Sequence, residues 1–265
     1  MGKVISIGVQ KGGVGKSTTT SILAYILYKI HKKNVLVIDF DGQGNSTQIL
    51  SRKNLSEFEG KTILDSIINE NIHDNIFDLK PQYADVINKK KFDLLAADDL
   101  ISTLGSKASS LNKNVYFILK EAIKPLIDDY DFILIDQPPN LGDQTISSLV
   151  ASDYAVVMLQ TEPLCYNAIP RYFNLIRNIK QEKFNANLYV AGILCTMQDR
   201  RTKIDSQVIN AANDEYKDFI FNTIIHRKTR IKEFSLIGIQ DRIKEDKEAL
   251  LQYKDFAKEL IKRVK

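Results

Sequence analysis

The stretch VQKGGVGKSTTT (residues 9–20) decides the fold. It places three glycines within four residues, between Lys11 and Lys16, and continues into a run of small hydroxyl residues. The apolar run before it (4–9) predicts a strand, and residues 17–33 predict a helix. A glycine-rich loop at this junction can turn backbone N–H groups and a helix N-terminus toward an anion. The stretch therefore predicts a phosphate-binding loop, although Gln10 stands where the general pattern G-x-x-x-x-G-K-[ST] has glycine.

The rest of the chain alternates short apolar runs with helical stretches, which predicts a doubly wound α/β fold. Because the runs are apolar throughout, we expect a mostly parallel sheet that is flanked by helices on both faces. The predicted strands are residues 4–9, 34–39, 92–97, 132–137, 154–160, 188–196 and 218–226. Residues 52–90 are more polar and predict helical decoration beside the sheet. No linker or repeat interrupts the pattern, so we expect a single domain over residues 1–265.

Composition restricts the class of protein. Of 265 residues, 44% are apolar and 26% are charged, with a formal charge of +4, which is typical of a globular protein with a mildly basic surface. The two cysteines, Cys165 and Cys195, are isolated, so neither a zinc site nor a disulfide framework is indicated. No apolar run approaches the roughly 18 to 20 residues of a membrane span. We expect a protein of the reducing cytoplasm.

Three aspartates lie where predicted strands end. In the stretch VLVIDFDGQGNST (35–47), Asp39 and Asp41 lie just at the end of the second predicted strand, and in FILIDQPP (132–139) Asp136 follows four apolar residues at the end of another. In an open parallel sheet the carboxyl ends of the strands surround the ligand crevice. Carboxylates beside a phosphate-binding loop suit coordination of Mg²⁺ and positioning of water. For any one of these aspartates alone, helix capping is the competing interpretation.

With these residues in view, the sequence resembles the ParA/Soj family of partition ATPases, within the ParA/MinD group that has a deviant Walker A motif. The resemblance is carried by QKGGVGKSTT (10–19), VLVIDFDGQGNST (35–47), FILIDQPPNLG (132–142) and GILCTMQDRRT (192–202). It continues to IIHRKTRIKE (224–233), where the family usually has Ile-Pro-Arg-Asn and this chain has Ile-His-Arg-Lys at 225–228. It covers nearly the whole chain and is weakest over residues 52–90.

The resemblance implies a P-loop NTPase fold with ATP and Mg²⁺ as cofactors. Lys16 would serve the nucleotide of its own subunit, and Lys11 would reach the nucleotide of the partner in an ATP-dependent homodimer. Asp41 would orient the attacking water, and Ser17, Asp39 and Asp136 would hold Mg²⁺. The implied nucleotide-binding residues are Lys11, Gly12, Gly13, Val14, Gly15, Lys16, Ser17 and Thr18, with Met197, His226 and Arg227 near the adenine.

The same resemblance implies partners. Members of the family bind DNA without sequence preference, and here the basic residues Arg200, Arg201, Arg227, Lys228 and Arg230 would make the contacts. A ParB-like centromere-binding protein would stimulate a weak ATPase, and the protein would associate with the nucleoid. No stable membrane association is expected.

Two alternatives stay open. The C-terminal stretch ALLQYKDFAKELIKRVK has apolar residues at helical spacing, which predicts either a helix packed on the sheet or a MinD-like membrane-targeting helix. The alternative function is therefore a MinD-like positioning ATPase at a membrane surface. A metabolic P-loop enzyme is a third class, and it would need a substrate pocket.

Overall fold

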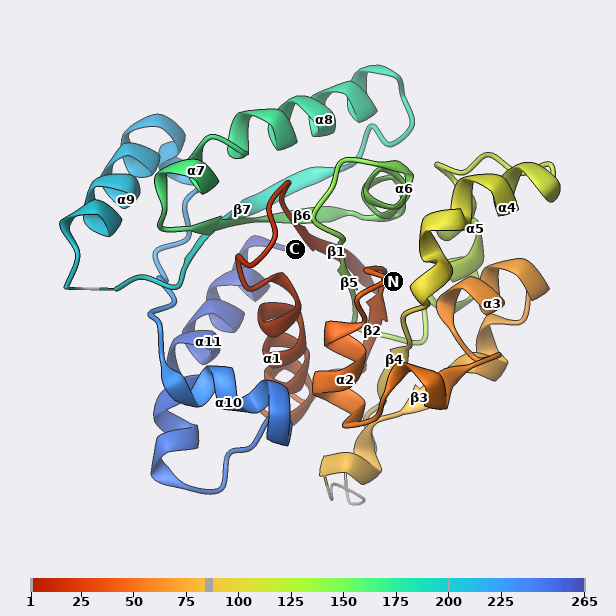
Figure 1. Cartoon of the computed structure of the whole chain (residues 1–265), viewed down its shortest axis with the longest axis horizontal. Helices are drawn as coiled ribbons and strands as arrows, with labels where there is room; N and C mark the ends of the chain where they lie inside the picture. The colour runs from red at the N-terminus through yellow and green to blue at the C-terminus, as the bar shows by residue number, and fades with distance from the viewer. Residues whose placement is uncertain (1, 84–87, 200, 265) are drawn as a thin grey trace.

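A computed structural model describes residues 2–83, 88–199 and 201–264. Within these residues the strands form one seven-stranded sheet in the order β3-β4-β2-β5-β1-β6-β7 (Figure 1). The strands are β1 (Lys3–Gly8), β2 (Val35–Asp39), β3 (Phe77–Asp78), β4 (Phe92–Leu95), β5 (Phe132–Asp136), β6 (Tyr154–Gln160) and β7 (Tyr189–Thr196). Every strand pair is parallel except β3 with β4. The predicted doubly wound α/β fold is confirmed.

Helices cover both faces of the sheet. One layer consists of α1 (Lys16–Lys29), α2 (Asn45–Ser51), α10 (Thr229–Ile237) and α11 (Lys244–Arg263). The other layer consists of α3 (Ile63–Asn69), α4 (Leu104–Ser110), α5 (Ile118–Ile123), α6 (Asp143–Ala151) and α8 (Ile169–Gln181). The short α7 (Pro163–Tyr166) contacts α9 (Lys203–Tyr216) beyond the carboxyl end of β6. Figure 1 shows α1 and α11 side by side below the sheet and α6 and α8 above it.

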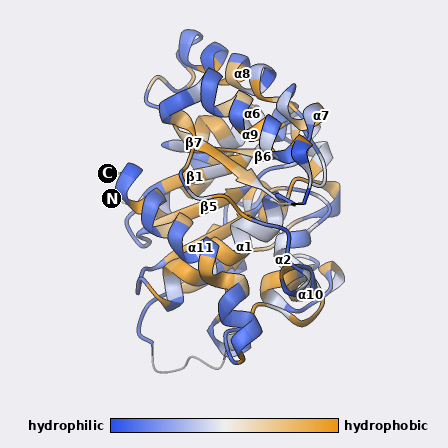
Figure 2. Cartoon of the chain, turned by 90° about the vertical axis from the view of Figure 1, so that its left-hand side faces the viewer, coloured by the Kyte–Doolittle hydropathy of each residue, from blue (hydrophilic) through white to orange (hydrophobic). Residues whose placement is uncertain are grey.

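The strands are buried on both faces, which explains their continuous apolar sequences. Residues 35–39 of β2 and 132–136 of β5 are buried without exception, and Figure 2 shows the central strands as hydrophobic between the helical layers. Leu36, Ile38, Ile133 and Ile135 face the layer of α3–α5, whereas Val35, Val37 and Leu134 belong to the core under α1. This alternation pins the register, because a one-residue slip would exchange the two faces of a strand.

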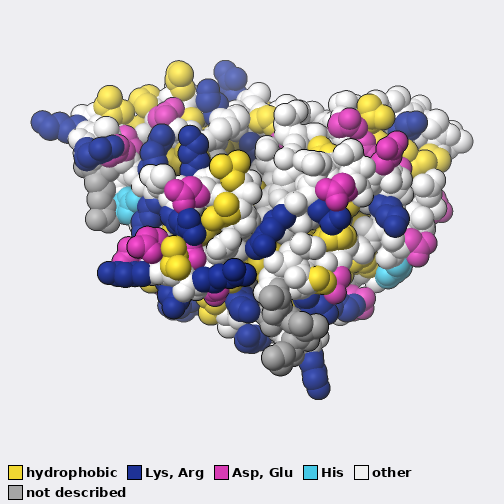
Figure 3. Space-filling view, turned by 60° about the horizontal axis from the view of Figure 1, so that its bottom comes forward, with side chains coloured by type: hydrophobic (Ala, Val, Ile, Leu, Met, Phe, Trp, Pro, Cys, Tyr) yellow, Lys and Arg dark blue, Asp and Glu magenta, His cyan; other side chains and the backbone are white. Residues whose placement is uncertain are grey.

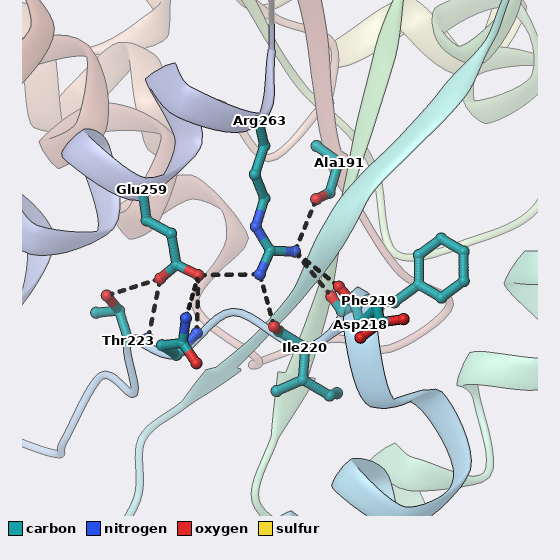
Figure 4. Close-up of polar contacts among 8 residues, drawn as sticks. Ala191, Asp218, Phe219, Ile220, Thr223, Glu259 and Arg263 are labelled. Atoms are coloured by element: carbon teal, nitrogen blue, oxygen red, sulfur yellow. Dashed lines mark hydrogen bonds and ion pairs between the residues drawn. The ribbon is translucent and has the colours of Figure 1, made fainter.

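The prediction of a strand at 218–226 is wrong. Residues 217–219 form a 3-10 turn, and the following segment meets β7 at an isolated bridge between Ile193 and Ile220 rather than along a continuous ladder. Single backbone hydrogen bonds join Phe221 to Ile193 and Ile225 to Cys195, and a second isolated bridge joins Gln198 and His226. Figure 4 shows the reason: side chains of α11 bind the backbone of this segment. Arg263 donates to the carbonyl oxygens of residues 218–220, and Glu259 accepts from the backbone N–H groups of Asn222 and Thr223.

Two further elements differ from or extend the predictions. The polar region 52–90 contains helix α3 and several 3-10 turns, as expected, but it also supplies the two-residue antiparallel edge strand β3. The C-terminal stretch forms α11, which packs against α1 and buries Leu250, Tyr253, Phe256 and Leu260. The packed-helix interpretation is therefore confirmed, although Leu251 remains 56% exposed. No helix among the described residues is long and apolar enough to cross a membrane.

Candidate nucleotide site

The predicted phosphate loop joins β1 to α1 and lines a cavity of about 340 Å³ at the carboxyl end of the sheet. Six of the predicted loop residues lie in its wall: Gly12, Gly13, Gly15, Lys16, Ser17 and Thr18. Gly13 and Gly15 have φ values of +77° and +84°, which glycine adopts at little cost. Nothing lies within 4 Å of a Cβ added at Gly12 or Gly13, so the loop leaves an open cradle for an anion.

The two lysines of the loop occupy different environments. Lys16 is 6% exposed, and its Nζ donates to the carbonyl oxygen of Lys11 at 2.9 Å. Burial lowers the pKa of Lys16, while the charges of Asp136 and Asp41 act in the opposite direction. Lys11 is half-buried, and its side chain does not line the cavity. The geometry thus assigns the cavity to Lys16 and leaves the Lys11 side chain outside it.

The three predicted aspartates come together at the ends of β2 and β5. Asp39 and Asp136 are direct neighbours in the β2–β5 register, and both are fully buried. Asp41 lies two residues beyond β2, is 8% exposed and lines the cavity. One oxygen of Asp41 accepts from the backbone N–H of Gln43 at 3.1 Å, which fixes the carboxylate against the following turn. Asp41 therefore faces the same cavity as Lys16, as predicted.

Burial and mutual repulsion favour the protonated forms of the two inner aspartates. Burial, followed by the charge of Asp136, raises the pKa of Asp39 well above its usual value. Burial also raises the pKa of Asp136 to about 6, although the Ser17 hydroxyl, the Ser46 hydroxyl at 2.7 Å and the Lys16 ammonium oppose this effect. A divalent cation beside them would relieve the repulsion.

The residues present fit Mg²⁺. The Oδ1 atom of Asp136 is buried and accepts no hydrogen bond, and the Ser17 side chain lies in the wall of the adjoining cavity. Within the described part of the chain no group of three or more His, Cys, Asp and Glu side chains is close enough to hold a metal by itself. The carboxylates of Asp39 and Asp136 with the Ser17 hydroxyl form a donor set that suits Mg²⁺, which is usually bound by one or two carboxylates together with waters and nucleotide phosphates.

Of the three residues predicted to lie near the adenine, one lines the cavity and two do not. Met197 lies in its wall and has a positive φ of 56°, and its Cε is 3.1 Å from a Cβ added at Gly15. His226 and Arg227 are held nearby, because Arg227 N donates to the Gln198 carbonyl and His226 N donates to the Gln252 side chain of α11. Neither of these two side chains lines the cavity. Val14 does not line the cavity either. Its carbonyl oxygen accepts a hydrogen bond from the Thr196 hydroxyl of β7.

The structure adds residues that the sequence did not single out. Thr47 binds Asp39 twice, through its backbone N–H at 2.7 Å and its hydroxyl at 2.8 Å. Ser46 links Asp136 to the carbonyl oxygen of Ser17. The cavity wall also includes Gln43, Asn45, Ile49, Pro139 and Ser235. The polar run GQGNST (42–47), directly after Asp41, contains most of these added residues and could have indicated them. No feature of the sequence around Ser235 indicates that it lies at the cavity.

The predicted DNA-contacting residues differ in how much of their charge is available. Arg201 has a side chain that is 87% exposed but ion-paired with Asp199, and Arg227 is exposed. Lys228 donates to the carbonyl oxygen of Glu248. Arg230 is ion-paired with Glu233 and with the fully buried Asp246, at 2.6 and 2.7 Å. Arg200 lies outside the described residues.

Lysine and arginine side chains gather on the face that bears α10 and α11. Figure 3 shows them over the left half of this view, on the side where these helices lie in Figure 1, with acidic side chains between them. Arg227 and Lys228 directly precede α10, and Ser235 of α10 lines the nucleotide cavity. The basic face is therefore continuous with the rim of the cavity.

Comparison with known proteins gives the relatives of this chain. A family model described as an AAA domain matches residues 2–190. The chain is 34% identical over 238 residues to the sporulation initiation inhibitor protein Soj of Bacillus subtilis (strain 168), covering 88% of this chain and 87% of that protein. It is 33% identical over 240 residues to the chromosome partitioning protein ParA of Myxococcus xanthus (strain DK1622), covering 90% and 80%.

The fold also matches solved structures. Cobyrinic acid a,c-diamide synthase from Mycobacterium smegmatis, with a bound ATP analogue and magnesium, is 25% identical with a TM-score of 0.76, over 97% of this chain and 93% of that one. This similarity concerns a P-loop architecture in which the other protein holds a nucleotide and a metal. The sequence relatives are more specific, because they are 33 to 34% identical over most of both chains, against 25% for the synthase. The chain therefore belongs to the ParA/Soj family of partition ATPases.

Proposed function

We propose that this protein is a partition ATPase that binds ATP with Mg²⁺, dimerises on ATP and then holds DNA without sequence preference. Hydrolysis, which is slow until a ParB-like partner stimulates it, returns the protein to the monomer and releases the DNA. The protein would act in the cytoplasm, on the nucleoid. The family supports the partition role, and the residues of the site support binding of a nucleotide with Mg²⁺.

The observation that carries this proposal is the different placement of the two loop lysines. Lys16 is buried beside Asp41 and Asp136 and faces the cavity, where its ammonium would neutralise nucleotide phosphates. Lys11 keeps its backbone carbonyl bonded to Lys16 while its side chain stays outside the cavity. A side chain so placed can reach a phosphate of a second subunit, and an extra cation there stabilises the charge of phosphoryl transfer.

The other site residues have complementary roles. Ser17, Asp39 and Asp136 would hold Mg²⁺, which neutralises phosphate charge when bound. Thr47 and Ser46 fix the two inner carboxylates by hydrogen bonds, so that the metal ligands are already oriented. Asp41, at the wall of the cavity, would orient the attacking water. Met197 would contact the nucleoside beside the loop.

For DNA we place the primary contacts on Arg201, Arg227 and Lys228. Arg230 is not among them, because Glu233 and the buried Asp246 both engage its guanidinium. A dimer doubles the number of phosphate contacts, and affinity for DNA climbs steeply with that number. A modest net charge is therefore enough for a grip that depends on ATP.

The test is binding of a labelled duplex of arbitrary sequence, measured by fluorescence anisotropy with ATP, with ADP and without nucleotide. The proposal predicts tight binding with ATP alone, and binding should weaken as salt concentration rises. Equal binding in all three conditions would contradict the nucleotide-dependent grip. Co-sedimentation with anionic liposomes under ATP, in the absence of DNA binding, would favour the MinD-like alternative.

A further inference from the structure

A second concave surface lies far from the nucleotide cavity. A groove of about 680 Å³ runs between α8 and the start of β7, and a hollow of about 430 Å³ adjoins it. We call the two together the aromatic groove, and its apolar wall consists of Phe173, Ile176, Leu188, Tyr189, Val190 and Phe219. Tyr154 and Tyr189, the first residues of β6 and β7, place it at the amino ends of these strands, whereas the nucleotide cavity is at the carboxyl ends.

Large apolar side chains in this groove face solvent. Tyr189 is 58% exposed and Phe219 is 45% exposed. Each ring is packed against a second ring: Phe219 meets Phe173 edge to face at 5.9 Å, and Tyr189 meets Tyr154 at 6.2 Å. Exposed aromatic side chains that are held in place are the usual anchors of protein interfaces, since they bury large areas with little loss of entropy.

The rings are also held by the backbone around them. Arg263 binds the carbonyl oxygens of Ala191 and of residues 218–220, which fixes the turn carrying Phe219 against β7. Figure 4 shows the Phe219 ring directed away from Arg263. Lys180 donates to the carbonyl oxygen of Leu188 and lies 4.8 Å from the centre of the Tyr189 ring. The groove is therefore formed before any partner binds.

The charged side chains that line the groove are predominantly positive. They are Arg177, Lys180 and Arg263, with Asp218 as the acidic member among the described lining residues. Because Arg263 is ion-paired with Glu259 at 2.9 Å, Arg177 and Lys180 carry the positive charge that a partner would meet. Helix α8 itself carries Arg171, Arg177 and Lys180 and no acidic residue. An occupant that is complementary to this surface has apolar side chains flanked by negative charges.

We propose that the aromatic groove binds an acidic amphipathic segment of a partner protein, with the apolar side chains of that segment seated on Tyr189 and Phe219. The aliphatic wall formed by Ile176, Leu188 and Val190 favours side chains over nucleobases. Nucleic acid would instead require a longer row of cations, because its affinity scales with the number of phosphates neutralised. Because the groove lies at the amino ends of β6 and β7, away from the nucleotide cavity at the carboxyl ends, we expect this docking to be independent of the nucleotide.

The test uses fluorescein-labelled 18-residue peptides and the full-length protein. One peptide has Leu at helical spacing with Glu elsewhere, a second has Lys in place of Glu, and a third has Glu without Leu. The Leu/Glu peptide should bind, with and without ATP, and should bind at least about tenfold more tightly than the other two. Phe219→Ser or Tyr189→Ser should weaken it by about tenfold or more, and Arg177→Glu by several-fold at low salt.

Matched controls are Leu251→Ser, an exposed leucine on α11, and Lys107→Glu, an exposed lysine on α4; neither should change peptide binding. Melting temperatures of all variants establish that they are folded. Absence of Leu/Glu binding, equal binding of the Leu/Lys peptide, or insensitivity to both Phe219→Ser and Tyr189→Ser would overturn the proposal. Groove-dependent binding of phosphatidylglycerol vesicles or a single-stranded oligonucleotide, without peptide binding, would reassign the surface. None of these readouts depends on ATP turnover.

Discussion

Asp39 and Asp136 lie directly opposite each other in the parallel register of β2 and β5, and neither has exposed surface. Two carboxylates buried side by side at the end of a sheet destabilise a folded protein unless a proton or a cation neutralises them. The protein provides Thr47 for one and Ser46 for the other, and it leaves an oxygen of Asp136 without a hydrogen bond. A cation bound beside this pair would therefore stabilise the folded protein.

The first prediction concerns the pH dependence of folding without metal. Burial raises the pKa of Asp136 from 3.8 to about 6, so the folded protein holds a proton that the unfolded chain releases. The contribution of Asp136 to stability is therefore complete below about pH 4 and is lost as pH rises toward 6. At pH 7.5 in EDTA, Asp136→Asn should raise the free energy of unfolding by an amount on the order of 2 kcal/mol.

Urea unfolding of the wild type and of Asp136→Asn between pH 4 and pH 8 measures this effect. The difference between the two proteins should grow with pH through the window from about 4 to about 6 and level off above it. Glu121→Gln, an exposed carboxylate on α5, serves as the control and should show no such growth. An Asp136→Asn protein less stable than the wild type at pH 7.5 would mean that the carboxylate pair is not under strain.

The second prediction concerns Lys16. Lys16→Ala removes the one loop ammonium that faces the cavity, so ATP binding should be lost together with the thermal stabilisation that ATP and Mg²⁺ give the wild type. A ligand at a hundred times its Kd contributes about 2.7 kcal/mol of stability, which a melting curve detects readily. Lys61→Ala, at an exposed position, should keep the full shift. A normal shift in Lys16→Ala would refute the loop assignment.

The third prediction concerns Asp41, which lines the cavity but lies outside the buried pair. Asp41→Ala should bind ATP normally and hydrolyse it at least about a hundredfold more slowly, because a water-positioning group is gone. The protein should then remain on DNA after ATP is added. Phosphate release and DNA dissociation are the measurements, with Asp74→Ala, at an exposed aspartate away from the cavity, as the control. Unchanged turnover would move the role to another residue.

The fourth prediction separates two arginines of the basic cluster. Arg227→Glu should weaken DNA binding to all sequences alike and reduce the salt slope by about one, while ATP binding persists. Arg230→Ala should instead lower the free energy of unfolding, since it removes the guanidinium that pairs with the buried Asp246 carboxylate. Equal effects of the two variants on stability would show that the ion pairs of Arg230 carry no weight.

The sequence predicted those parts of the site that depend on strand ends. Asp39, Asp136 and the loop residues stand at the ends of apolar runs in the sequence, and these runs form the strands that end at the nucleotide cavity. The segment 218–226 has the composition of a strand, but Gln252, Glu259 and Arg263, which bind its backbone, are 26 to 45 residues distant in the chain. The need for glycine at position 192 could not be predicted from the neighbouring sequence either. A Cβ there would lie 2.7 Å from the carbonyl oxygen of Phe219, which is distant in the chain. The sequence predicted Arg230 to be a free surface charge, because its partner Asp246 lies on α11 and is brought to it only by the packing of α10 against α11.

The central claim is that Lys11 acts across a dimer interface while Lys16 acts within its own subunit. The most direct measurement is molar mass by light scattering with ATP and Mg²⁺, in an Asp41→Ala background that prevents hydrolysis. The Asp41→Ala protein should double its mass with ATP and remain monomeric with ADP. The same protein with Lys11→Gln should bind ATP with unchanged affinity and stay a monomer. A Lys11→Gln protein that still doubles its mass with ATP would contradict the account.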